Sequence, residues 1–467
     1  MNTQQRLQHL YRRAGFGLSP KEWNQLKRRS TRRMLDDLFK EAHRASQRKV
    51  IKGGAGIELD MVAMNKKTLS KAEEKEKKKQ NKLRLGAYNT DWVMRMADIN
   101  ESALLEKMCL FWHGHFACIT KTAGLARQQL NTIRTHALGN FRELVIAISK
   151  DSSMIRFLNT QQNKKRKPNE NYARELMELF TIGRGNYTEQ DIKEAARAFT
   201  GWSSNLRGEF VFRKRQHDFG TKIFMGKTGR WNGEDIIDII LEKRTTAEFI
   251  ARKTYRFFVN ENVNEGHVQQ LASIFYDSDY DIEKLMRTIF ASDWFYDEIN
   301  VGSKIKSPME LIAGLMRTFE VTIENPLSLI FIQKALGQKL FDPPNVAGWT
   351  GGKSWIDNST LMLRMNLANV IFQNSELNLR VKDELEAKKR GKRKRKIQAS
   401  VNFSPFYQLF KRENENKLLE KMGAYLLPPA TPLKKSTFND FLIKNSKEDL
   451  IKTLCLRLMS MPEYQLC

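Results

Sequence analysis

The sequence has 467 residues, of which 41% are hydrophobic, and this is enough to bury a core in one large or two to three ordinary domains. Its apolar runs fall far short of the ~20 residues that cross a bilayer, and its first residues lack the apolar core of a signal peptide, so it predicts neither feature. The net charge of +27 is typical of proteins with a polyanionic partner, and its position along the chain decides how it is interpreted.

The N-terminal residues 1–47 carry apolar side chains at helical spacing, among them Trp23, Leu26 and Phe39. Residues 48–86 follow and include the run SKAEEKEKKKQNKLR, which has no apolar periodicity that could be buried. We therefore predict N-terminal helices followed by a charged linker or insertion.

Residues 87–375 are predicted to form a helical core with motif-bearing loops. Apolar residues at helical spacing run through the motif FWHGHF, residues 111–116, and place it on a buried helix despite Gly114. On a helix, His113 and His115 are ~200° apart and cannot bind one metal ion together, so the HxH pattern does not by itself indicate a metal site. We keep His113 as a candidate metal ligand, with a hydrogen-bonded core histidine as the alternative.

Four cysteines are present, and Cys109 and Cys118 are separated by nine positions. On a helix this spacing puts the two side chains on opposite sides, which favours reduced thiols. Reduced thiols and the missing signal peptide predict a cytoplasmic protein, and export by another route stays open.

The segment PNENYARELMELFTIGRGNYTEQDIKEAARAFTGW, residues 168–202, predicts a hairpin of two capped helices. Asn169 is suited to cap the first helix, and Gly183 is suited to end it. Thr188, with Asp191 three residues later, matches a capping box that opens the second helix. The result is a helical hairpin with several carboxylates near the start of its first helix.

The first of these helices carries the strongest candidates for chemistry. Glu170, Arg174 and Glu175 are candidate catalytic residues, because burial and a neighbouring guanidinium can drive two carboxylates to different pKa values. Asn171 and Tyr172, at the same helix start, are candidate substrate-binding residues. The alternative is an exposed salt-bridge ladder that stabilises the helix and carries no chemistry.

Two short β-rich runs, residues 209–213 and 222–225, predict a local β-hairpin around His217 and Asp218. Because loop side chains can reach a cleft, both residues are candidate catalytic residues, and His217 is also a candidate metal ligand. Trp202, which ends the preceding FTGW motif, is a candidate substrate-binding residue.

The motif FDPPNVAGW, residues 341–349, combines rigid prolines with a tryptophan. Its Trp349 could stack on a sugar or another flat ligand, with Asn345 as a polar partner, so both are candidate substrate-binding residues. The alternative is that the tryptophan fills a core.

Nineteen of the 27 net positive charges come from three segments, residues 48–84, 164–167 and 388–396. The last belongs to a predicted basic insertion, residues 376–400, which precedes C-terminal helices over residues 401–467 that are expected to pack on the core. Such tracts are usually solvated loops, and no aromatic stacking positions are interleaved with them. Lys388 to Lys396 is nevertheless a candidate contact for a polyanion, because basic tracts can hold phosphate backbones.

Several motifs together resemble the bacterial family catalogued as domain of unknown function 1800. They are, in chain order, HLYRRAGFG at residues 9–17, FWHGHF, NENYARELMELFTIG, FTGW, HDFGTKIFMG at residues 217–226, FDPPNVAGW and the terminal LMSMPEYQLC. The resemblance spans nearly the whole chain and implies a bacterial origin and a mostly helical fold. It supplies no activity to transfer.

These patterns predict a mainly α protein, a large helical globular fold with one short β-hairpin and charged insertions. Two functions follow. The first is an acid–base or metal-assisted hydrolase of a polar or polymeric substrate, with a divalent metal as a candidate cofactor; its Glu, His and Arg side chains must converge within ~10 Å on one pocket. The second is a non-catalytic binding or assembly protein for an anionic polymer or a protein partner.

Overall fold

The structure, a computed structural model, describes residues 1–48, 70–373, 376–377, 395–429, 431–434, 438 and 442–467. Helices dominate these residues, and strands occur only as short antiparallel pairs. The predicted mainly α class is therefore confirmed.

Three helices open the chain: α1 (Thr3–Ala14), α2 (Pro20–Leu26) and α3 (Thr31–Ser46). Capping boxes at Asn2 and Ser19 satisfy free main-chain N–H groups at the starts of α1 and α2. All three helices turn apolar side chains into the core, as the spacing of the sequence predicts.

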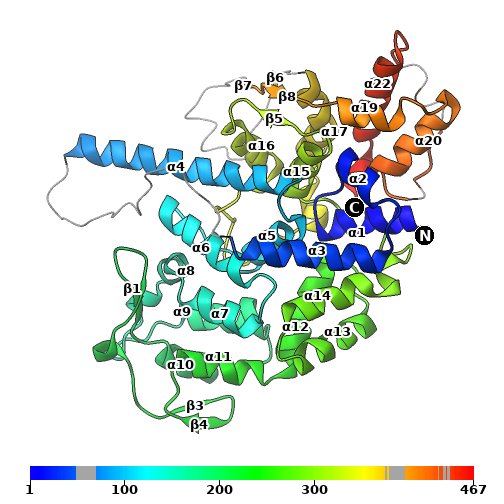
Figure 1. The fold of residues 1–467 in the computed structure, drawn as a ribbon. Helices are drawn as coiled ribbons and strands as arrows, with labels where there is room; N and C mark the ends of the chain where they lie inside the picture. Colours follow the sequence, from blue (N-terminus) through cyan, green and yellow to red (C-terminus); the bar gives the residue numbers. More distant parts are fainter. Residues whose placement is uncertain (49–69, 374–375, 378–394, 430, 435–437, 439–441) are drawn as a thin grey trace.

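The long helix α4 (Lys71–Ala97) begins inside the segment predicted as a charged linker. Ser70 and Glu73 form a capping box at its start, and lysine and glutamate are good helix formers. Its second half buries Tyr88 and Trp92, and the helix continues from this packed half into the charged half. Figure 1 shows the N-terminal end of α4 projecting from the body of the protein.

Helix α5 (Ala103–His115) carries the FWHGHF motif and is buried along nearly its whole length. His113 and His115 contact different neighbours, as a helical motif requires: His113 lies against Trp92, and His115 lies against Phe180. The predicted buried helix is confirmed. It is followed by α6 (Ala123–His136), α7 (Phe141–Ser149) and α8 (Ser152–Phe157).

The predicted helical hairpin is also present. Its first helix, α9 (Asn171–Glu175), passes into a π-helical turn at Leu176–Thr181, and its second is α10 (Glu189–Ala198). The capping box of Thr188 and Asp191 forms as predicted. Asn169 lies one position before the N-cap residue, and its side-chain oxygen accepts the N–H of Asn171 at 3.1 Å.

The two β-rich runs form strands, but the predicted pairing between them is wrong. They give two hairpins in place of one, β1 (Trp202–Ser204) with β2 (Phe210–Phe212), and β3 (Lys222–Phe224) with β4 (Lys227–Gly229). Met225 and Gly226, both with positive φ, make the two-residue turn that pairs β3 with the strand directly after it. Local turns therefore chose the partners of both strands.

The remaining helices are α11 (Gly233–Leu241), α12 (Arg244–Phe258), α13 (Glu265–Asp277), α14 (Ile282–Ala291), α15 (Pro308–Thr318), α16 (Ser328–Leu336), α17 (Asn358–Gln373), α19 (Ser404–Phe410), α20 (Glu415–Leu426) and α22 (Lys447–Met459). Strand β5 (Thr322–Ile323) pairs with β8 (Ala399–Ser400), and β6 (Glu376–Leu377) pairs with β7 (Arg395–Lys396). Over the described ranges, no helix has the length and apolar character needed to cross a membrane.

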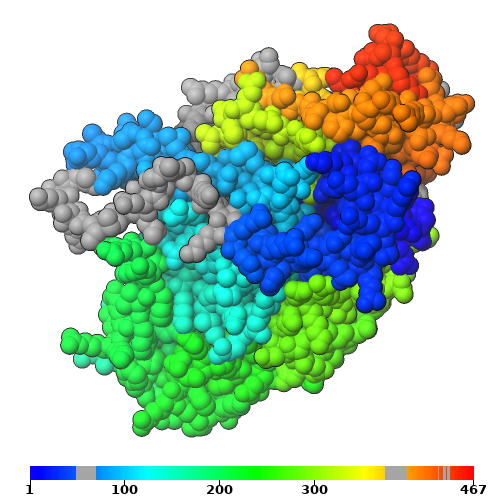
Figure 2. All heavy atoms as spheres, in the orientation of Figure 1, coloured from blue at the N-terminus to red at the C-terminus, as the bar shows by residue number. Residues whose placement is uncertain are grey.

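In Figure 1, helices α6 to α14 and the two hairpins occupy the lower half, and α15 to α22 occupy the upper half together with α1 and α2. The two ends of the chain meet in the upper half, where Arg12 of α1 donates to the carbonyls of Tyr425 and Leu427 at 2.8 Å each. Figure 2 shows the N-terminal segment next to C-terminal segments on the same face.

Candidate polyanion-binding surface

The predicted catalytic residues of α9 form an ion-pair network near the surface. The Arg174 guanidinium donates to both carboxylate oxygens of Glu189 at 2.8 Å and to Glu170 at 3.3 Å. The side chains of Arg174 and Glu170 are 35% and 38% exposed. These hydrogen bonds to Glu189 hold the pKa of Arg174 above its usual value. This is the salt-bridge ladder that was the alternative for these residues, extended to the first turn of α10.

Glu175 lies on the same helix but outside this ladder. It is half-buried, and burial, followed by the charge of Glu178, raises the pKa of its carboxyl. Glu178 itself pairs with Arg184 and accepts the hydroxyl of Tyr187 at 3.3 Å.

His217 and Asp218 belong to a second network at the other end of α10. The Nδ1 of His217 lies 2.8 Å from the Thr200 carbonyl oxygen, which can only accept, so Nδ1 carries the proton. Burial lowers the pKa of His217, so the ring is neutral at pH 7. Asp218 accepts Nε of Arg197 at 2.8 Å; burial alone would raise its pKa, but the hydrogen bonds from Arg197 and Gly220 lower it.

The two networks are separated along α10. Glu189 is in its first turn and Arg197 in its last, and eight residues along a helix span roughly 12 Å. The hydrogen bonds of Glu170 and Arg174 run to Glu189, whereas those of Asp218 run to Arg197. The contacts therefore do not bring the five predicted catalytic residues together.

Two of the candidate substrate-binding residues near α9, Tyr172 and Trp202, pack in the core, whereas Asn171 is exposed. Tyr172 and Trp202 are 2% and 4% exposed, and both meet Phe199 edge-on at 5.0 Å between ring centroids. The Tyr172 hydroxyl is hydrogen-bonded to Ser149. Asn171 donates its side-chain amide to the Leu158 carbonyl at 3.2 Å and fastens α9 to the preceding helix.

The FDPPNVAGW loop is fastened to α5 by His113. Nε2 of His113 accepts the N–H of Phe341 at 3.1 Å, and its ring lies 5.7 Å from that of Trp349, which is half-buried. Burial lowers the pKa of His113 to about 4. Asn345 is exposed, and its side-chain oxygen accepts the Ala347 N–H at 2.9 Å within the loop.

The two candidate metal ligands, His113 and His217, have different hydrogen-bond partners: His113 binds Phe341, and His217 binds Thr200. Within the described part of the chain, no three His, Cys, Asp or Glu side chains come together as metal ligands. All four cysteines are buried and free.

A surface that the sequence did not predict lies beside His217. Residues 164–167 form a tight turn in which Lys167 donates its N–H to the Lys164 carbonyl at 2.8 Å. The N–H of Lys165 donates to the Gln216 carbonyl at 2.8 Å and joins this turn to the segment after β2. In Figure 1, β1, which pairs with β2, lies to the left of α8 and α9 in the lower half of the molecule.

The buried Asn163 anchors the turn of residues 164–167 to the rest of the protein. It is 1% exposed, its side-chain amide donates to the Ala196 carbonyl at 2.7 Å, and its side-chain oxygen accepts the Asn169 N–H at 2.9 Å. Its main-chain carbonyl accepts the Gly201 N–H at 3.0 Å. The turn is therefore tied to α10, to the FTGW motif and to the start of α9.

Seven cationic side chains belong to this turn and to the segment after β2. All are exposed, and none forms an ion pair or side-chain hydrogen bond with another residue of the described ranges. They are Lys164, Lys165, Arg166, Lys167, Arg213, Lys214 and Arg215. By contrast, the nearby Arg174 and Arg197 are both paired with carboxylates. The cluster therefore carries uncompensated positive charge that an anionic polymer can neutralise.

Two phenylalanine rings lie beside these charges. Phe212 is 37% exposed and Phe219 is 60% exposed. Both meet the His217 ring edge-on, at 5.1 and 4.6 Å between centroids, so His217 supports them from the protein side. We call the seven cations and these two rings the basic–aromatic surface.

Comparison with known protein families assigns the chain to one of them. The family described as protein of unknown function (DUF1800) matches residues 9–466. This chain belongs to the DUF1800 family. No curated protein and no solved structure matched it.

The sequence of this DUF1800 protein indicates part of the basic–aromatic surface. The four bases at residues 164–167 were visible, but the aromatic rings lie about fifty residues later, on either side of Arg213–Arg215, so no aromatic residue is interleaved with the four bases themselves. Arg213 ends a predicted strand, and Lys214 and Arg215 directly after it are typical of an ordinary polar turn. The predicted polyanion contact at Lys388 to Lys396 stays a prediction, because residues 378–394 lie outside the described ranges.

Proposed function

We propose that this protein binds single-stranded nucleic acid through the basic–aromatic surface and catalyses no reaction there. The observation that carries the proposal is the joint placement of seven unpaired cations and two exposed phenylalanine rings on one backbone-anchored surface. It is the second of the two functions that the sequence suggested, with a different segment in contact with the polymer.

The chemistry of the surface favours a single strand. Lysine and arginine side chains neutralise backbone phosphates, and exposed aromatic rings stack on bases whose faces are free. A duplex hides the faces of its bases. A sugar polymer needs side chains that hydrogen-bond its hydroxyl groups, but the neighbouring carboxylate of Asp218 is already held by Arg197.

The alternative function, a hydrolase, is not supported in the same way by the contacts of its candidate catalytic residues, which are Glu170, Arg174, Glu175, His217 and Asp218. Arg174 and Asp218 are bound to other charged side chains, and the neutral His217 donates to a carbonyl. An acid–base pair would need both groups at one substrate atom.

Fluorescence anisotropy with a labelled 20-nucleotide single strand tests the proposal. We expect a Kd of about 10⁻⁶–10⁻⁴ M at physiological salt, weakening as salt rises with a log–log slope of about −0.7 for each phosphate contacted. Replacing Lys164, Lys165, Arg166 and Lys167 by glutamine should flatten that slope by up to about 3.

The matched control removes four exposed lysines of α4 instead: Lys71, Lys75, Lys77 and Lys82. This variant has the same net charge, so it reports on charge alone. Equal weakening by both variants would contradict a local site. Tighter binding to a sulfated polysaccharide than to the single strand would assign the surface to a different polymer.

A further inference from the structure

A second feature lies on the other side of the molecule, where the first and last motifs of the chain meet. A cavity of about 50 Å³ is enclosed by α1, α15, α20 and the 3₁₀ turn Pro462–Gln465. Arg12 and Phe16 come from the HLYRRAGFG motif, and Tyr464 comes from the LMSMPEYQLC motif. Neither motif contributes to the basic–aromatic surface.

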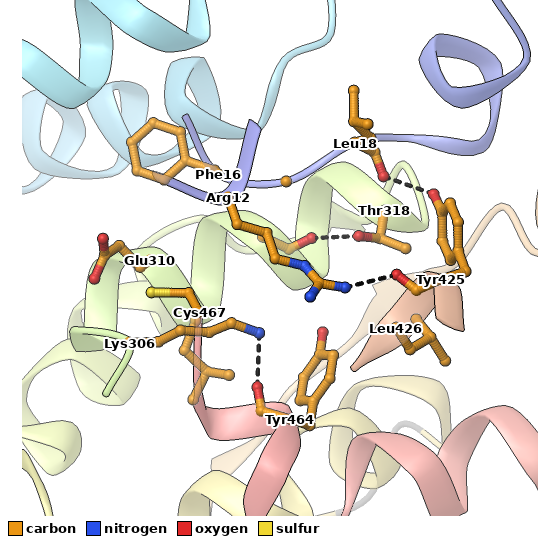
Figure 3. Close-up of a pocket in the computed structure, with 13 residues that line it drawn as sticks. Arg12, Phe16, Leu18, Lys306, Glu310, Thr318, Tyr425, Leu426, Tyr464 and Cys467 are labelled. Atoms are coloured by element: carbon orange, nitrogen blue, oxygen red, sulfur yellow. Dashed lines mark hydrogen bonds between the residues drawn. The ribbon is translucent and has the colours of Figure 1, made fainter. Parts of the chain in front are cut away.

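Three hydrogen-bond donors turn toward this cavity. In Figure 3 the Arg12 guanidinium, the Lys306 ammonium and the Tyr464 hydroxyl point toward the same space. The first two also donate to main-chain carbonyls: Arg12 to Tyr425 and Leu427 at 2.8 Å, and Lys306 to Tyr464 at 2.6 Å. Burial raises the pKa of Tyr464, so its hydroxyl keeps its proton and remains a donor.

Neither cation has a carboxylate partner among the residues that the structure describes. The Lys306 ammonium lies 4.0 Å from the centre of the Tyr464 ring, and its partners are a carbonyl and this ring. Carbonyl oxygens satisfy the hydrogens of a buried cation but do not neutralise its charge. Burial, followed by the charge of Arg12, lowers the pKa of Lys306 to about 7.

More positive charge lies behind the cavity. Arg13 and Arg364 are each 1% exposed, and Nε and Nη1 of Arg13 and Nη1 of Arg364 have no hydrogen-bond partner in the described structure. Lys304 is 6% exposed, and burial lowers its pKa to about 8. Five cations therefore gather here, counting Arg12 and Lys306.

The carboxylate side chain in the cavity wall, that of Glu310, already has partners. Glu310 pairs with the buried Lys107, and its other oxygen accepts the Ser307 N–H at 2.6 Å in the capping box of α15. The main chain of Cys467 is turned to that of Lys304, with which it exchanges hydrogen bonds of 2.9 and 3.4 Å. Burial lowers the pKa of both Arg12 and Lys306; Cys467 opposes this shift for both, and Glu310 opposes it for Lys306, but neither forms an ion pair with them in the described structure. The five cations outnumber these two acidic groups, and a ligand can balance the remaining charge.

We infer that this cavity is a binding site for a phosphate-like oxyanion, which Arg12, Lys306 and Tyr464 hold. Its volume matches a group of a few heavy atoms, since one water-sized sphere needs roughly 10–15 Å³ on the same measure. Two cations and a hydroxyl suit a doubly charged tetrahedral group, and the carboxylate side chain in the cavity wall, that of Glu310, is paired with Lys107. The inference uses none of the residues of the proposed nucleic-acid surface.

The test measures thermal unfolding of the full chain while sodium sulfate is added, with sodium chloride at matched ionic strength as the reference. Sulfate is the probe because it does not titrate near neutral pH. We expect a saturating rise in Tm, as for any ligand that binds only the folded state, and a smaller rise with sodium acetate. A larger response to acetate than to sulfate would overturn the preference for a tetrahedral group.

Lys306→Met separates a binding role from a structural one. With sulfate absent, we expect the variant to be at least as stable as the wild type, because an uncompensated cation is removed, and the sulfate response should disappear. Tyr464→Phe removes one hydroxyl and should weaken sulfate binding about fivefold to tenfold. Lys21→Met, at an exposed position of α2, should keep the full response.

The same titration at pH 6 and pH 9 gives a second readout. A bound anion favours the protonated form of Lys306, so the wild-type affinity for sulfate should fall as the pH rises through about 7. An unchanged sulfate response in Lys306→Met, or a wild-type response equal to that of chloride, would overturn the inference.

Discussion

Gly201 and Arg213 meet backbone to backbone at the base of the basic–aromatic surface. The N–H of Arg213 donates to the Gly201 carbonyl at 2.8 Å. Gly201 has a φ of +81°, and a Cβ at this position would lie 2.7 Å from the Arg213 carbonyl oxygen. The glycine of the FTGW motif therefore allows the arginine-bearing segment to lie against the end of α10.

Gly201→Ala should disturb this junction. The positive φ alone costs alanine about 1–2 kcal/mol, and the clash with main-chain oxygen should bring the loss of unfolding free energy to roughly 3 kcal/mol. Gly185→Ala is the matched control, because Gly185 has a φ of +84° but nothing within 4 Å of its added Cβ. Denaturant unfolding measures both variants, and equal losses would show that the contact with Arg213 is unimportant.

Phe219→Ala should weaken binding of a single strand without changing its salt dependence. Loss of one stacked base costs about 1–3 kcal/mol, whereas the number of phosphate contacts is unchanged. Anisotropy titrations over a range of salt separate the two effects. Met362→Ala on α17, at a side chain that is 68% exposed, controls for the loss of exposed apolar surface. A flatter salt slope in Phe219→Ala would argue against stacking.

Asp151 should make stability fall as the pH rises. It is 3% exposed, and burial, opposed by its cap hydrogen bonds to Met154 and Ser153, raises its pKa to about 7. The unfolded chain therefore loses this proton near pH 4 and the folded chain near pH 7, so stability is lost between these values. One of its oxygens is buried without a partner, which makes the ionised form costly.

Asp151→Asn keeps the capping oxygen and removes the titration. Its unfolding free energy, relative to the wild type, should rise by roughly 3–4 kcal/mol between pH 4 and pH 8. Chemical denaturation at both pH values measures this difference. A constant difference would mean that Asp151 is ionised in the folded protein at pH 4.

His113 should make stability fall as the pH falls, which is the opposite of the effect of Asp151. Its folded pKa, lowered by burial to about 4, lies below the unfolded value of 6.5, so its contribution to stability is present above pH 6.5 and is lost as the pH falls toward 4. His113→Gln keeps an acceptor for the Phe341 N–H and should reduce this acid-induced loss by roughly 3 kcal/mol. His43→Gln, at an exposed position of α3, makes the same substitution outside the core and is the matched control.

Local patterns in the sequence predicted the parts of the fold that depend on neighbours along the chain. The capping box of Thr188 and Asp191 formed as expected, and the apolar spacing through residues 111–116 gave a buried helix whose histidines point apart. These features rest on hydrogen bonds and side-chain spacing within one or two turns, which are fully written in a short segment.

Two predictions failed where the partner of a segment decided its structure. The runs at residues 209–213 and 222–225 are strands, but each pairs with a closer neighbour across its own turn. Residues 71–86 form a helix although they bury little, because the helix continues from a packed second half. In both cases the deciding contact lies outside the segment whose pattern gave the prediction.

The sequence by itself determined the mainly helical class, the family and the residue types available for a site. Only the tertiary structure decided which of them meet: Lys165 with Gln216, Phe219 with His217, and Arg12 with Tyr425. It also separated Glu170 from Asp218 by the length of α10. The physical reason is that burial, charge compensation and stacking depend on distances between segments far apart in the chain, and no spacing within one motif records them.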